Sequence, residues 1–115
     1  MQPFARDDQR LDFRVDVDFL LNKYIDGKPY LCRATNISRC GLRVERVFEP
    51  KHGEEAIGLQ FQLPGTDRII TCSGRIAHQA ATDHADGITL EAVAPEHQEM
   101  IDDFILKRLD WAALI

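Results

Sequence analysis

The chain has 115 residues, of which 44% are hydrophobic and 29% are charged, and its formal net charge is −5. These values are typical of one globular domain, and the sequence has no apolar run of the roughly 20 residues that a membrane span needs, so we expect no membrane insertion. The acidic charge also argues against general nucleic-acid binding, which requires a contiguous basic face.

The N-terminal segment 1–13 contains Arg10 among mixed charges and shows no hydrophobic periodicity. It lacks the basic start and apolar stretch of a secretory signal, which predicts a cytoplasmic location. Because little in its composition would hold it to a core, we expect residues 1–13 to form a mobile arm that carries the first arginine. Residues 14–115 are expected to form the folded domain.

From Arg14 onward, hydrophobic and polar residues alternate, which is typical of strands with one face on a core. The first predicted strand ends at Asp26–Gly27, a dipeptide that favours a type I′ hairpin because both of its residues need positive φ. Further strands are predicted over about 28–38, 42–50, 57–63, 70–78 and 87–93, with turn residues between them. This pattern predicts an all-β fold, either a six-stranded antiparallel barrel or a sandwich.

After the last predicted strand the hydrophobic period changes, which predicts a helix beginning near Pro95. Hydrophobic residues then recur at spacings of three and four, namely Met100, Ile101, Phe104, Ile105 and Leu109. We place Lys107 and Arg108 in its last turn. The helix is expected to plug one mouth of the barrel or pack on its side, leaving Trp111 and Leu114 for the barrel or a partner.

Two polar motifs flank the first two predicted strands: Arg10 and Arg14 before them, and Asn36, Ser38 and Gly41 after them. Asn36 and Ser38 are expected to share one strand face, and Gly41 to permit a sharp turn and the close approach of a ligand. Arginine forks match guanine edges or phosphate oxygens, and an amide and a hydroxyl can meet the polar edge of a purine. Together they indicate a site for a guanine-bearing, phosphate-bearing ligand.

Each motif alone is also typical of a solvated tail or of a strand end before a turn, but their joint occurrence in this order favours a site. With both motifs, the chain resembles the PilZ domain family of bacterial cyclic di-GMP receptors, whose members carry RxxxR before the first strand and [D/N]xSxxG after the second. The resemblance implies a six-stranded antiparallel barrel with a C-terminal helix. It also implies a mobile clamp of Arg10 and Arg14 and a fixed platform of Asn36, Ser38 and Gly41.

The same resemblance implies a stand-alone receptor that binds cyclic di-GMP and relays the signal to a downstream protein partner by ordering its N-terminal arm. Many members have a tryptophan near the ligand, and His78 is the nearest candidate for that position. Two alternatives remain open: an adaptor of the same fold that binds no nucleotide, and a small oligonucleotide-binding barrel. The second would need exposed aromatic residues and a basic groove, whereas Phe19 and Phe61 follow the core pattern.

The sequence shows no catalytic set, because no nucleophile or carboxylate stands beside a plausible base and orienting group. We therefore expect no enzyme activity and no cofactor besides the ligand. His52, His84 and His97 lack a spacing that would bring metal ligands together, and Cys32, Cys40 and Cys72 show no CxxC pattern. No metal site or disulfide is expected.

Overall fold

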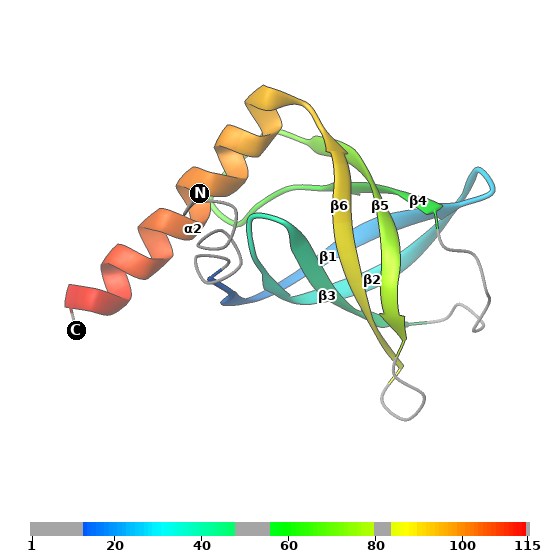
Figure 1. Ribbon diagram of the computed structural model, residues 1–115, viewed down its shortest axis with the longest axis horizontal. Coiled ribbons are helices and arrows are strands. Elements are labelled where there is room, and N and C mark those ends of the chain that lie inside the picture. The colour runs from blue at the N-terminus through cyan, green and yellow to red at the C-terminus, as the bar shows by residue number, and fades with distance from the viewer. Residues whose placement is uncertain (1–12, 48–55, 80–83, 115) are drawn as a thin grey trace, which may run out of the picture.

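The computed structural model describes residues 13–47, 56–79 and 84–114. Within these ranges the elements are β1 (Val15–Ile25), β2 (Lys28–Ile37), β3 (Gly41–Arg46), β4 (Ala56–Phe61), β5 (Ile70–Gln79), β6 (Ala85–Val93) and α2 (Pro95–Leu114). The strands form a closed barrel in the order β1-β2-β3-β6-β5-β4, and every pair is antiparallel (Figure 1). The predicted six-stranded antiparallel barrel with a C-terminal helix is thus confirmed.

The turns explain where the strands end. Asp26 and Gly27 have φ values of 51° and 79°, as the predicted β1–β2 hairpin requires. β4 ends at Phe61 rather than near Leu63, because the Leu63 carbonyl accepts hydrogen bonds from the backbone N–H and the hydroxyl of Thr66 and so belongs to a turn. The predicted end of the third strand near residue 50 falls outside the described residues.

The barrel interior follows the predicted alternation along β1, where Val15, Leu21 and Ile25 are buried. Phe61 is also buried, and its ring stacks on that of the half-buried Phe19 at a centroid distance of 5.7 Å. Both aromatic residues therefore belong to the core, as expected, and they are not available as exposed stacking platforms for an oligonucleotide.

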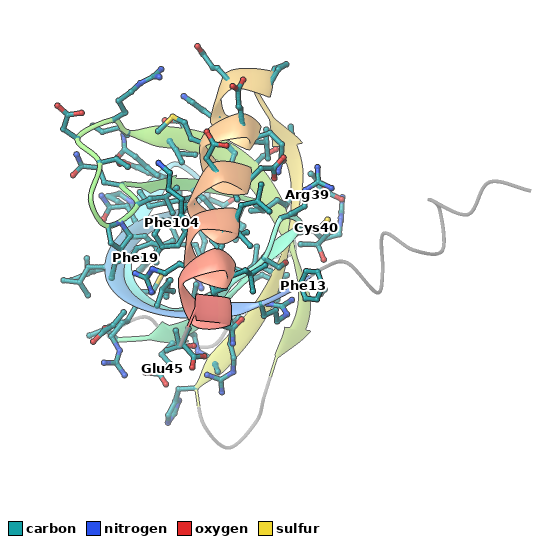
Figure 2. The ribbon with its side chains drawn as sticks, turned by 90° about the vertical axis from the view of Figure 1, so that its left-hand side faces the viewer. Phe13, Phe19, Arg39, Cys40, Glu45 and Phe104 are labelled. Atoms are coloured by element: carbon teal, nitrogen blue, oxygen red, sulfur yellow. The ribbon has the colours of Figure 1, made fainter. Side chains whose placement is uncertain are left out.

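Helix α2 lies across one end of the barrel, in front of the strands in Figure 2. Ile101 and Ile105 are buried in the same hydrophobic cluster as the barrel interior. The helix continues to Leu114, so the placement of Lys107 and Arg108 in its last turn is wrong; the residues that follow contain no glycine or proline to end it.

Arg108 fastens the helix to the barrel: its NH1 donates to the Asp16 carbonyl at 3.2 Å, and its guanidinium lies 4.8 Å from the centre of the Phe104 ring. No helix in the described part of the chain has both the length and the apolar character needed to cross a membrane.

Candidate ligand-binding site

The turn that joins β2 to β3 forms the frame of the candidate site. The Ser38 N–H donates to the Gly41 carbonyl at 2.9 Å, and the Cys40 N–H donates to the Ser38 hydroxyl at 3.2 Å. The Leu90 N–H of β6 donates to the Cys40 carbonyl at 2.8 Å, which ties the turn to the neighbouring strand. These bonds hold residues 38–41 in one conformation.

Ser38 does not share a strand face with Asn36, so that expectation is wrong. β2 ends at Ile37, so Ser38 lies in the turn and not on the strand, and the side chains of both Ile37 and Ser38 are buried. Asn36 is half-buried on the strand itself. Ser38 therefore shapes the turn from within, and Asn36 supplies the accessible amide.

The barrel brings Arg14 of the first motif to Asn36 of the second. In the antiparallel β1–β2 pair, Asp16 lies opposite Asn36 and Val15 opposite Ile37. This register places Arg14, just before β1, beside the end of β2, where its NH1 donates to the Asn36 Oδ1 at 2.7 Å. Arg14 is exposed and its partner is a neutral amide, so this contact leaves the positive charge available to an anion.

Gly41 is required by packing and not by a positive φ; among the described glycines, positive φ occurs at Gly27 and Gly65. A Cβ on Gly41 would lie 2.7 Å from the Ile88 carbonyl oxygen and 3.4 Å from the Arg14 NH2. Gly41 closes the predicted turn, because its carbonyl accepts the Ser38 N–H at 2.9 Å, but a glycine is needed there for packing and not for its φ. Because Gly41 has no side chain, β3 can lie close to both β6 and the Arg14 side chain.

Arg39, between the serine and glycine of the motif, links the turn to α2, and sequence reasoning assigned it no role. Its Nε donates to the Asp102 Oδ1 at 2.9 Å and its NH2 to the Oδ2 at 3.2 Å. The Gln98 Nε2 donates to the Arg39 carbonyl at 3.1 Å and to the Asp102 Oδ1 at 2.9 Å. In Figure 2, Arg39 and Cys40 lie on the same side of the molecule as the exposed Phe13.

Several predicted features lie outside the described residues. They include Arg10 and the rest of the arm, apart from Phe13, and the side chain of His78, whose backbone in β5 lies opposite Gly87. Across the described ranges, no group of three histidine, cysteine or acidic side chains is arranged to hold a metal ion.

A second charged cluster, which sequence reasoning missed, lies inside the barrel; we call Lys23, Arg46 and Asp86 the interior cluster. The Lys23 Nζ lies 3.1 Å from the Asp86 Oδ2, and the Arg46 NH1 donates to the Asp86 Oδ1. The side chains of Lys23 and Asp86 are fully buried. The sequence does contain a sign of this cluster: Lys23 alternates with Leu21 and Ile25 along β1, which places it on the inward face of the strand.

Solved structures share this fold. The Bacillus subtilis inhibitor of motility (MotI/DgrA) aligns with a TM-score of 0.68 and 16% identity, over 84% of this chain and 48% of that one. This chain thus spans about half the length of that protein chain. An uncharacterized Legionella protein, Lpg0364, aligns with a TM-score of 0.51 and 17% identity, over 90% of this chain and 99% of that one.

Among curated proteins, none matches the chain significantly. A family model does match, and it covers most of the sequence, including both polar motifs and all the strands. That model is the PilZ domain, matched over residues 8–107, and the chain therefore belongs to the PilZ domain family.

Proposed function

We propose that this protein is a receptor for cyclic di-GMP that relays the signal to a downstream protein partner by ordering its N-terminal arm. The observation that carries the proposal is the 2.7 Å hydrogen bond from Arg14 to Asn36, which joins the two polar motifs at one place on the barrel. Family membership supports it, because PilZ domains act as receptors or adaptors and not as enzymes.

Each residue of the proposed site has a chemical role. Arg10 and Arg14 would grip phosphate oxygens and guanine edges, because their forks donate two hydrogen bonds at once. Asn36 would offer its amide to a guanine once Arg14 turns to the ligand. Ser38 and Gly41 would keep the platform in shape, the first through the Cys40 N–H and the second by admitting Arg14 closely.

Calorimetric titration with cyclic di-GMP tests the receptor function. Cyclic di-AMP is the matched control, since it has the same phosphodiester ring without the guanine edge. We expect saturable binding of cyclic di-GMP and much weaker binding of cyclic di-AMP. No binding of either nucleotide would favour the alternative, an adaptor of the same fold that does not bind nucleotide.

Hydrogen exchange tests the relay. Amides of residues 11–14 are expected to gain protection when cyclic di-GMP binds, while those of β4 change little. Equal protection of residues 11–14 with and without the nucleotide would contradict the ordering of the arm but not the binding itself.

A further inference from the structure

Arg39 occupies an unusual place, because one side chain connects the proposed nucleotide platform to the C-terminal helix. Its backbone belongs to the hydrogen-bonded turn between Ser38 and Gly41, next to the position of Arg14. Its guanidinium forms a two-pronged ion pair with Asp102 of α2. Both ends of this contact are accessible, with 49% of the Arg39 side chain and 28% of the Asp102 side chain exposed.

We propose that Arg39 is a third arginine of the nucleotide site, which exchanges Asp102 for a phosphodiester of the ligand and thereby loosens the tie between the turn and α2. This inference rests on the proposed function. It assigns α2, in addition to the N-terminal arm, as an element that responds to the ligand.

Arg39 can exchange the Asp102 carboxylate for a phosphodiester without leaving either charged side chain without a hydrogen-bond partner. A phosphodiester presents two oxygens to a guanidinium much as a carboxylate does, so Arg39 can keep its fork geometry with either partner. An exposed ion pair contributes little net stability, so giving it up is not costly. Asp102 would not be left without a donor, because the Gln98 Nε2 already donates to its Oδ1 at 2.9 Å.

The consequence concerns the first half of α2. The Arg39–Asp102 pair between the turn and α2 would be lost, whereas the bond from Gln98 to the Arg39 carbonyl would remain. Ile101 and Ile105 would still anchor the helix in the core. We therefore expect a local loosening of residues 98–106 and not the detachment of the helix.

Asp102→Asn tests the exchange, with Asp103→Asn as the matched control. Both substitutions remove one negative charge from adjacent helix positions, but Asp102 is the one that holds Arg39. Relative to Asp103→Asn, Asp102→Asn should tighten binding of cyclic di-GMP, by up to about fivefold, because the ligand no longer competes with a carboxylate. Arg39→Ala should weaken binding about tenfold and abolish the difference between the two asparagine variants.

The outcomes separate this inference from the function on which it rests. If the wild-type protein binds cyclic di-GMP but Asp102→Asn binds no more tightly than Asp103→Asn, Arg39 is only a structural link and the inference is overturned alone. If the wild-type protein binds no cyclic di-GMP, the proposed function fails and the inference with it.

Hydrogen exchange provides the second readout. In the wild-type protein, amides of residues 98–106 should exchange faster when cyclic di-GMP is bound, and in Arg39→Ala the nucleotide should cause no such change. Unchanged or greater protection of this segment in the saturated wild-type protein would overturn the release of α2.

Discussion

The two ends of β1 meet charged clusters with opposite properties. Near its end lies the interior cluster, in which the Asp86 carboxylate binds both Lys23 and Arg46 inside the barrel. At its start lies what we call the turn cluster, formed by Arg14, Asn36, Arg39 and Asp102 on the surface. Each cluster joins arginine to an oxygen acceptor, so burial is the main difference between them.

Burial determines whether a charged side chain in these clusters can exchange one partner for another. Inside the barrel, removing one partner leaves a charge without compensation in a medium where water cannot replace it, so the contacts cannot be exchanged. On the surface, water and salt screen the charges, and a hydrogen bond can be given up for another at little cost. The interior cluster therefore tolerates the loss of a partner poorly, whereas the turn cluster can exchange one partner for another.

The largest expected effect is on the interior cluster. Asp86→Ala would remove the acceptor that Lys23 and Arg46 share, and we expect it to lower the free energy of unfolding by about 3–5 kcal/mol. Urea denaturation followed by circular dichroism measures the loss. Asp18→Ala is the control, because 74% of the Asp18 side chain is exposed and the loss should be small. Equal stability of the two variants would contradict the distinction between the clusters.

Gly41→Ala is expected to lower both the stability of the protein and its affinity for the nucleotide. The new Cβ would lie 2.7 Å from the Ile88 carbonyl oxygen, so the strands must shift, and we expect a loss of about 1–3 kcal/mol with weaker nucleotide binding. Gly58→Ala is the matched control, because there the nearest atom is the Tyr24 Cβ at 3.4 Å. Should Gly41→Ala match this control in both stability and affinity, the packing argument is wrong.

Arg14→Ala should separate binding from stability. Because hydrogen bonds to charged groups are strong, Arg14→Ala should lower the affinity for cyclic di-GMP at least about tenfold. Arg10→Ala should have the same effect. The unfolding midpoint should hardly change, because Arg14 is exposed. Arg33→Ala serves as the control, since this exposed arginine pairs with Asp18 and Glu45 away from the turn. Wild-type affinity in both Arg14→Ala and Arg10→Ala would exclude the arginine clamp.

The smallest perturbation uses Cys40, an exposed thiol within the turn. Cys32 and Cys72 are buried, and burial raises the pKa of the Cys72 thiol to about 11, so both should react slowly with Ellman's reagent. Cyclic di-GMP should slow the labelling of Cys40 by covering the turn. Cys40→Ser identifies the rapid phase, and an unchanged rate at saturating nucleotide would place the ligand elsewhere.

Much of the fold could be predicted because the signals are local. The alternation of hydrophobic and polar residues along β1 predicts which side chains face inward. Asp26–Gly27 predicts the hairpin, because both residues favour positive φ. The strand ends were less accurate, since Leu63 is buried like a strand residue although its carbonyl belongs to a turn. For the site, the register of β1 with β2 brings Arg14 of the first motif to Asn36 of the second, whereas Arg10 lies outside the described residues and the binding of a ligand stays a prediction.

The strand pattern, the hairpin, the helix and the residue types of the two motifs can be predicted from the sequence, because these depend on periodicity and on the chemistry of neighbouring residues. The burial of Ser38 and the contact between Lys23 and Asp86 depend on how the barrel folds in three dimensions. The same is true of the contact between Arg39 and Asp102, which are 63 positions apart in the chain. Such contacts arise when the barrel closes and α2 packs across it, and no local preference encodes which distant charges then become neighbours.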